Sequence, residues 1–276
     1  MNDQPTVALN DGRSMPQHGF GVWRVSAEEA APAVGAALAA GYRLVDTAMM
    51  YRNEEGVGVA LRSSGLERDA VWVTTKLWNG DHGYDATLRA CEASLARLGM
   101  EAVDLYLIHW PCPAKGLYVD SWRAMVRLRD EGRVRSIGVS NFTPETLDRV
   151  IDATGIVPAV NQIELHPRFQ QREMRALHAQ LGIVTQSWSP LGRGGLEADP
   201  VLAAIAAAHG RSWAQVVIRW HLQSGLAVIP KSVTPARIAA NRAVFDFTLA
   251  EEEMAAIAGL DDPGGRRGSH PDTVNG

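Results

Sequence analysis

Residues 103–109 read VDLYLIH, and this stretch decides how the rest of the chain is interpreted. A short run that is apolar almost throughout is typical of a parallel strand buried on both faces. Working outward from it, seven similar runs are separated by longer helix-like stretches. The other strands are expected at Gly19–Trp23, Arg43–Asp46, Val71–Lys76, Ser136–Asn141, Ala159–Glu164, Val184–Ser189 and Ala227–Ser232.

The segments between these runs carry signals for the start and end of helices. Ser26 and Glu29 form a possible capping box before an Ala-rich stretch, whose first turns Pro32 shortens or kinks. Glycines follow several stretches as C-terminal caps. The helices expected after this first one are 53–62 before Gly65, 85–98 before Gly99, 121–130 before Gly132, 170–181 before Gly182, 212–223 and 235–241.

Alternating strands and helices predict parallel pairing, and eight such units close into a (β/α)8 TIM barrel. The 276 residues fit one barrel domain over 1–276, since such barrels commonly reach about 250 residues. An open doubly wound sheet is the runner-up, but Gly19-Phe20-Gly21 lacks the rest of a Gly-x-Gly-x-x-Gly pattern. Before the barrel, residues 7–9 and 14–15 predict a β-hairpin with a type I′ turn at Asp11-Gly12, which would cap the barrel bottom.

We expect a soluble cytoplasmic protein. The net charge is −4, and no run of like charge points to nucleic acid or a membrane surface as partner. Cys91 and Cys112 suggest neither a disulfide framework nor a metal site. No secretory signal or apolar run of membrane-spanning length is visible.

Four polar side chains lie where a barrel places its chemistry. Asp46, Lys76 and His109 end the second, third and fourth strand runs, and Tyr51 lies five residues after Asp46. The carboxyl ends of barrel strands meet at one rim. Taken singly, Asp46 could be a helix cap, Tyr51 a packed or exposed residue and His109 a structural histidine. Lys76 needs a partner, because burying an unpaired ammonium is costly. Together the four indicate an active site.

Their combination suits proton donation to a carbonyl oxygen. Tyrosine, with a pKa near ~10, is a poor acid at neutral pH, and a nearby ammonium is expected to lower that pKa. Asp46 would hold Lys76, and His109 would hydrogen-bond and orient the carbonyl. The site lacks a Gly-x-Ser-x-Gly nucleophile, a reactive Cys and a cluster of metal ligands. A hydride from a nicotinamide cofactor would complete the chemistry.

Three spaced motifs resemble the signatures of the aldo-keto reductase family, closest to bacterial 2,5-diketo-gluconate reductase-like members. They are GYRLVDTA at 41–48 with Tyr51, Asn53, Glu54 and Gly58; SIGVSNF at 136–142; and IPKS at 229–232 with Arg237 and Asn241. TKLW at 75–78, IHWP at 108–111 and SHP at 269–271 extend the resemblance over essentially the whole chain. It implies a monomer that uses NADPH to reduce a small aldehyde, ketone, keto-acid or keto-sugar.

The resemblance also assigns individual roles. Tyr51 becomes the general acid, tuned by Lys76 and Asp46, and His109 orients the carbonyl. Ser140, Asn141 and Gln162 would hydrogen-bond the carboxamide of the nicotinamide. Trp188 stands where many relatives have a Tyr that stacks on the nicotinamide, and its larger ring face can serve the same role. The residues implied along the pyrophosphate are Ser189, Leu191 and Gly192.

The adenosine end is assigned in the same way. Lys231, Ser232 and Arg237 match the residues that bind the 2′-phosphate, and two cations with a hydroxyl near a helix start suit an anion. They favour NADPH over NADH. Asn241 would contact adenine. Ala240 departs from the Glu or Gln of many relatives, which predicts weaker cofactor affinity without a change of reaction.

Aromatic residues at the strand ends predict the substrate pocket. Trp23, Trp78 and Trp110 follow the first, third and fourth strands, so they either pack in the core or wall the pocket. The family resemblance favours the wall, with Met49 and Met50 as adaptable apolar surface nearby. The segments after His109 and Asp262 are short, which predicts an open pocket.

Two other functions compete with this interpretation. A redox sensor or regulatory subunit would keep the barrel and bind NADPH with little turnover, but the complete four-residue site weighs against it. A metal-dependent barrel hydrolase would need clustered His and carboxylate ligands at the strand ends, and no such cluster is present in the sequence.

Overall fold

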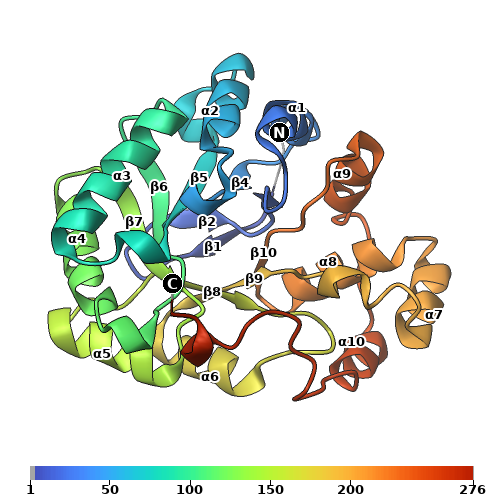
Figure 1. Cartoon of the computed structure of the whole chain (residues 1–276). Coiled ribbons are helices and arrows are strands. Elements are labelled where there is room, and N and C mark those ends of the chain that lie inside the picture. The colour runs from blue at the N-terminus through green and yellow to red at the C-terminus, as the bar shows by residue number, and fades with distance from the viewer. Residues whose placement is uncertain (1–3, 276) are drawn as a thin grey trace.

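A parallel barrel forms the body of the molecule in the computed structural model, which describes residues 4–275 (Figure 1). Eight strands lie in the order β10-β9-β8-β7-β6-β5-β4-β3, and every pairing is parallel. The predicted (β/α)8 fold is therefore confirmed. Its strands are β3 (Phe20–Gly21), β4 (Leu44–Asp46), β5 (Trp72–Leu77), β6 (Val103–Ile108), β7 (Val134–Ser140), β8 (Val160–Glu164), β9 (Val184–Trp188) and β10 (Ala227–Val228).

The barrel closes where its first and last strands meet. His18 forms a parallel bridge with Val228, just before β3 begins. The Gly19 amide donates to the Val228 carbonyl at 2.8 Å, and the Val228 amide donates to the Gln17 carbonyl at 2.8 Å. The last predicted strand, 227–232, is cut short to two residues because Pro230 has no amide to continue the ladder.

Helices surround the barrel, as Figure 1 shows, and each predicted helix is present within a few residues of its expected bounds. In α1 the capping box at Ser26 forms, but the predicted shortening by Pro32 is wrong. The helix runs from Ala27 to Ala39, and Pro32 lies on its exposed side, where its missing amide leaves no buried carbonyl unpaired. The others are α2 (Glu54–Ser63), α3 (Tyr84–Leu98), α4 (Tyr118–Asp130), α6 (Arg172–Leu181), α8 (Trp213–Gln223) and α9 (Pro235–Arg242).

Three further helices are not among those predicted. They are α5 (Pro144–Thr154), α7 (Pro200–His209) and α10 (Glu251–Ala258). Signals for two of them are in the sequence: Thr143 is the N-cap of α5 and Pro144 its first residue, and Asp199, whose side chain accepts the Val201 and Leu202 amides, caps α7. Helix α10 begins with three glutamates, whose negative charges interact favourably with the positive end of the helix dipole and so stabilise the helix start.

An antiparallel hairpin of β1 (Thr6–Ala8) and β2 (Ser14–Pro16) precedes the barrel, as predicted, but its turn differs. The register pairs Ala8 with Ser14, and the Leu9 amide donates to the Arg13 carbonyl, so three residues form the loop. The predicted type I′ turn at Asp11-Gly12 is wrong. That turn requires positive φ at both central residues, and of this pair only Gly12, at φ 84°, has it.

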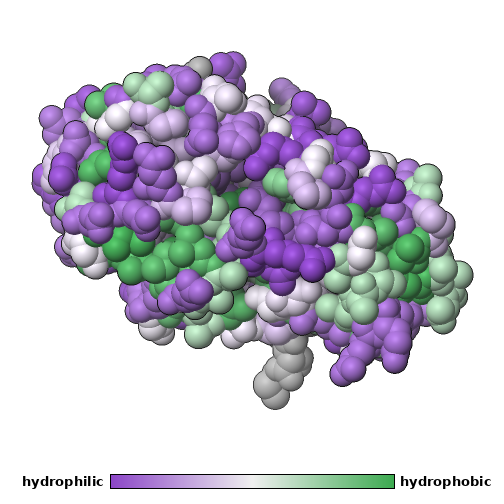
Figure 2. Space-filling model, turned by 90° about the horizontal axis from the view of Figure 1, so that it is seen from below, coloured by the Kyte–Doolittle hydropathy of each residue, from purple (hydrophilic) through white to green (hydrophobic). Residues whose placement is uncertain are grey.

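Apolar side chains fill the lower end of the barrel and the layer outside the sheet. Met15 from the hairpin is fully buried among Leu44, Leu105 and Leu107, so the hairpin closes the lower end of the barrel as expected. A larger cluster lies between the sheet and the helices of the first half. On the face shown in Figure 2, hydrophilic residues surround separate hydrophobic areas.

Across residues 4–275, no single helix is long and apolar enough to cross a membrane. Helices α7 and α8 meet the test only as a pair bent by 91°.

The seam of the barrel is predicted to weaken in acid. Burial, followed by the charge of Arg242 and by His221, lowers the pKa of His18 from 6.5 to about 3. Between these values the unfolded chain binds a proton at His18 that the folded chain does not, so stability is full above pH 6.5 and falls as the pH drops toward 3. One such group contributes up to about 1.4 kcal/mol per pH unit.

Replacing His18 by Phe should therefore flatten the decline of the unfolding free energy between pH 6.5 and 4, measured by urea denaturation. The ring neighbours Tyr42 and Phe245 favour an aromatic replacement. The exposed His270 supplies the control variant, His270→Phe. An unchanged pH slope in His18→Phe would show that His18 is not responsible.

Candidate active site

The four predicted polar residues meet at the carboxyl ends of three neighbouring strands. Asp46 is the last residue of β4, Lys76 lies near the end of β5, and His109 directly follows β6. Tyr51 ends a short 3-10 helix, η1 (Met49–Tyr51), in the loop after β4. The order β4-β5-β6 in the sheet brings all four to one rim, the position where barrel enzymes hold their catalytic groups.

Lys76 is completely buried and is held by oxygen atoms. Its Nζ donates to Asp46 Oδ1 at 2.5 Å and to the Thr47 carbonyl at 2.8 Å. The other carboxylate oxygen of Asp46 accepts from Gln162 Nε2 at 2.7 Å. Gln162 in turn donates to Gln186 Oε1 at 2.6 Å, so the pair is linked across the barrel to β8 and β9.

Burial and pairing act in opposite directions on these two groups. Burial raises the pKa of the Asp46 carboxyl and lowers the pKa of the Lys76 ammonium, while the opposite charge of each partner favours the ionised forms. Two charges with no access to water need such mutual satisfaction, because removing either one leaves the other buried and unpaired.

Tyr51 and His109 lie next to this pair. The Lys76 Nζ lies 5.1 Å from the centre of the Tyr51 ring. The rings of Tyr51 and His109 are 5.7 Å apart and nearly perpendicular, at 77°. Burial, followed by the charge of Lys76, holds the pKa of His109 well below 6.5, so its imidazole is neutral at neutral pH. A neutral imidazole carries one N–H donor that can meet a carbonyl oxygen.

The expected effect of Lys76 on Tyr51 is not found in this structure. Burial, followed by the charge of Asp46, raises the pKa of Tyr51 well above 10. Asp46 contacts the ammonium at 2.5 Å and so offsets the charge that was expected to stabilise a tyrosinate. The Tyr51 phenol therefore stays protonated, and its proton remains available.

The residues predicted to hold a nicotinamide form a connected chain beside the rim. Asn141 Nδ2 donates to the His109 carbonyl at 2.9 Å and to Ser140 Oγ at 3.0 Å. Trp188 Nε1 donates to Asn141 Oδ1 at 2.8 Å, which fixes the half-buried indole. Asn141 adopts the left-handed conformation, φ 61°, tolerated by asparagine. Gln162 belongs to the network that holds Asp46.

The residues predicted along the pyrophosphate lie in the loop after β9. Ser189 and Gly192 have positive φ values of 48° and 59°, and Leu191 precedes the 3-10 turn η5 (Gly192–Gly194). Arg193 from this turn places its guanidinium 4.8 Å from the Trp23 ring centre and 5.5 Å from that of Trp188. The loop thus lies against the aromatic side chains of the rim.

The residues predicted for the 2′-phosphate gather around the start of α9. Lys231 and Ser232 follow β10, and the exposed Arg237 lies in the first turn of α9. Within residues 4–275, neither Lys231 nor Arg237 forms an ion pair. Asn241 lies buried near the end of the same helix.

Tryptophans border the four-residue cluster. The Trp78 ring lies 5.2 Å from His109, and Trp110 lies 6.5 Å from Trp188. Trp23 is farther round the rim, beside Arg24 and Arg193. Met50, which was predicted to add apolar surface near the pocket, has 38% of its surface exposed.

The C-terminal segment, residues 263–275, is short and polar, yet it is attached close to the candidate site. Glu164, fully buried at the end of β8, accepts the Arg267 and Gly268 amides at 2.7 and 2.9 Å. Farther along, Asn275 Oδ1 accepts the Ala114 amide from the loop after β6. The segment therefore crosses the mouth of the barrel, as Figure 1 shows.

Sequence reasoning missed three contributors to this arrangement. Glu164 is a carboxylate that ends a buried strand, as Asp46 does, so the same criterion would have found it. Gln186 is a polar residue inside the barrel, and only its bond to Gln162 reveals its part. Arg193 follows a glycine in a loop, and nothing in the sequence indicates its stacking.

Among residues 4–275, no three His, Cys, Asp or Glu side chains lie close enough together to hold a metal ion.

Comparison with known proteins gives one consistent result. The aldo/keto reductase family model matches residues 14–262. An aldo-keto reductase of Mycobacterium sp. (strain KMS) is 60% identical over 271 residues, which cover 98% of each chain. The methylglyoxal reductase DkgA of Yersinia pestis is 52% identical over 274 residues, covering 99% of this chain and 98% of that one.

Solved structures agree. A crystal structure of a Gox0644 variant in complex with NADPH superimposes with a TM-score of 0.95 at 52% identity and covers 99% of both chains. The apo form of Gox0644 gives a TM-score of 0.96 at the same identity and coverage. The chain belongs to the aldo/keto reductase family.

Proposed function

We propose that this protein is an NADPH-dependent reductase that converts a small aldehyde, ketone, keto-acid or keto-sugar to the alcohol. One observation carries the proposal: Tyr51 and the neutral His109 lie beside a fully buried Lys76–Asp46 pair at the rim of the barrel. Membership of the family, a relative named methylglyoxal reductase and a neighbour crystallised with NADPH support the same reaction.

The residues along β7 to β10 fit the cofactor. Trp188 is half-buried and is held by Asn141, which suits a ring that stacks on a nicotinamide. The positive φ of Gly192 gives the following loop a sharp turn beside it. Lys231 and Arg237 lack counter-charges among the described residues, and Ser232 lies between them in sequence, which suits a 2′-phosphate.

In this proposal the side chains divide the work around the carbonyl group. NADPH, when bound, supplies the hydride. His109 donates a hydrogen bond to the carbonyl oxygen and orients it. Tyr51 transfers its phenolic proton to that oxygen as negative charge develops there, because the developing alkoxide is a stronger base than tyrosinate. Lys76, anchored by Asp46 and Thr47, lies beside the Tyr51 ring, and because Asp46 offsets much of its charge it gives the tyrosinate only part of the stabilisation of an unpaired ammonium.

Replacing Tyr51 by Phe should remove the proton donor and keep the cofactor site. We expect kcat for methylglyoxal to fall by roughly 10²- to 10⁴-fold, the usual contribution of a general acid, with unchanged NADPH affinity. Tyr84→Phe, on the exposed surface of α3, is the matched control and should keep full activity. NADPH oxidation and fluorescence titration give the two readouts.

Turnover of Tyr51→Phe at the wild-type rate would rule out the proposed role of its hydroxyl. NADPH binding by the wild-type protein, without turnover on any member of a panel of aldehydes, α-dicarbonyls and keto-sugars, would favour the redox-sensor function instead.

Replacing Arg237 by Met should lower the preference for NADPH. Loss of one charged hydrogen bond, about 1.5–3 kcal/mol, corresponds to an increase of about tenfold or more in the KM for NADPH, with KM for NADH unchanged. Arg89→Met on α3 removes an exposed arginine elsewhere and serves as the control. Equal changes with both cofactors would contradict a 2′-phosphate contact.

A further inference from the structure

A broad cavity open to solvent lies at the end of the barrel opposite the candidate active site. Its volume is about 730 Å³, within the range of about 300–1,000 Å³ that is usual for small-molecule sites. It is lined by Val184 at the start of β9, whereas Trp188, at the other end of the same strand, belongs to the active-site rim. Helices α6, α8 and α10 and the strand β1 supply the rest of its wall.

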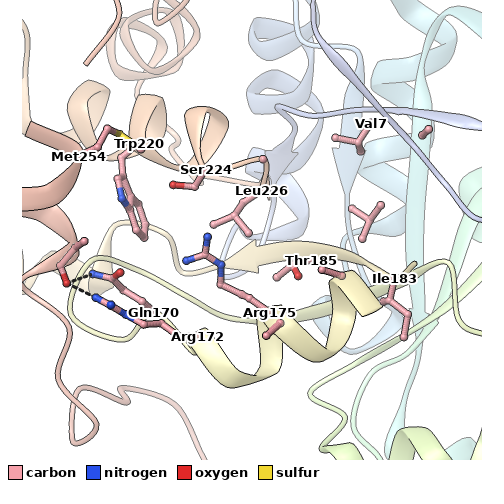
Figure 3. A pocket seen from close by; sticks show the side chains of 16 residues that line it. Val7, Gln170, Arg172, Arg175, Ile183, Thr185, Trp220, Ser224, Leu226 and Met254 are labelled. Carbon is pink, nitrogen blue, oxygen red and sulfur yellow. Dashed lines mark hydrogen bonds between the residues drawn. The ribbon is translucent and has the colours of Figure 1, made fainter. Parts of the chain in front are cut away.

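Most of the cavity wall is apolar. The Trp220 side chain, only 2% exposed, and Leu226, which follows α8, form one side. Ile183 and Met254 line other parts of the wall, as Figure 3 shows. Trp220, Leu226 and Ile183 are nearly fully buried, so the apolar surface that faces water comes mainly from the exposed Ala176 and Ala179 and the half-buried Val7, Val184 and Met254. A hydrocarbon chain lying on that surface would remove apolar area from water.

One charged side chain projects into this apolar space. In Figure 3 the Arg175 guanidinium points from α6 into the middle of the cavity, between Trp220 and Leu226. Arg175 is half-buried, and among residues 4–275 its guanidinium makes no hydrogen bond or ion pair within the protein. Burial, followed by the charge of Arg172, lowers the pKa of Arg175.

The neighbouring polar groups are already satisfied. Arg172 pairs with Asp261 at 2.9 Å. Asp261 also accepts the Gln170 amide at 2.8 Å, and Gln170 Nε2 donates to the Pro167 and Ile257 carbonyls. Arg172 and Asp261 offset each other's charge. The guanidinium of Arg175, which faces the cavity, is therefore a positive charge without a counter-charge among the described residues.

We propose that this cavity binds a monocarboxylate with an apolar body, such as a medium-chain aliphatic acid. The Arg175 guanidinium would donate two parallel N–H bonds to the two carboxylate oxygens, and the chain would lie along the apolar wall formed by Val7, Ala179 and Val184. One negative charge matches the one uncompensated positive charge. This site is separate from the catalytic rim and does not depend on the proposed reductase function.

Titration calorimetry with sodium octanoate tests the proposal, with octanamide as the uncharged ligand of the same length. The wild-type protein should bind octanoate saturably and octanamide at least tenfold more weakly. Arg175→Met should lose at least tenfold in octanoate affinity, whereas Arg175→Lys, which keeps the charge, should lose less. Arg123→Met on α4 removes an exposed arginine outside the cavity and should bind as the wild type does.

A second variant tests the location without altering the charge. Ala176 lines the cavity and is exposed, so Ala176→Phe fills the space without disturbing the core, and it should weaken octanoate binding at least tenfold. Circular dichroism checks that each variant is folded. Equal affinity for the two ligands, unchanged octanoate affinity in Arg175→Met or Ala176→Phe, or no saturable binding to the wild-type protein would each overturn the proposal.

Discussion

The bond between Lys76 and Asp46 is the constraint on which the rest of the site depends. An ammonium without water contact must receive all its stabilisation from the protein, and here one carboxylate oxygen and one carbonyl provide it. The second oxygen of Asp46 is tied to Gln162, and Gln162 to Gln186. Strands from opposite sides of the barrel must therefore keep their register for the pair to remain satisfied.

This arrangement makes the predicted catalytic residues and the predicted cofactor residues one connected network. Asn141 bonds both the His109 carbonyl and the Trp188 indole, and Gln162 bonds Asp46. Residues assigned to the nicotinamide thus also hold the residues assigned to the carbonyl. In such a connected network a change at one member alters several contacts at once, so effects of substitutions are not expected to add.

The sequence predicted those features that follow from local pattern. The strand runs that end in Asp46, Lys76 and His109 predicted the barrel and the position of its rim. A buried apolar run and the polar residue at its end can both be recognised without tertiary information. The prediction of a type I′ turn at Asp11-Gly12 is wrong because this dipeptide fits loops of more than one length. The hydrogen bond between Leu9 and Arg13 fixes a three-residue loop here. The rise in the pKa of Tyr51 comes from its burial and from the charge of Asp46, and neither can be read from the sequence alone. The roles of individual site residues remain predictions.

The attachment of the C-terminal segment has a consequence for how this scaffold can change. Glu164 accepts hydrogen bonds from main-chain amides of residues 263–275 and from none of their side chains. Every residue except proline has such an amide. The identity of Arg267 is therefore free to vary while the segment stays in place. Gly265 and Gly268 are exceptions, because a Cβ would lie 1.7 Å from the Arg168 carbonyl oxygen in the first case and 2.5 Å from the Trp188 ring in the second. The mouth of the barrel thus combines a fixed main-chain path with some side chains, such as that of Arg267, that can change, so new contacts at the mouth can arise without rebuilding the rim.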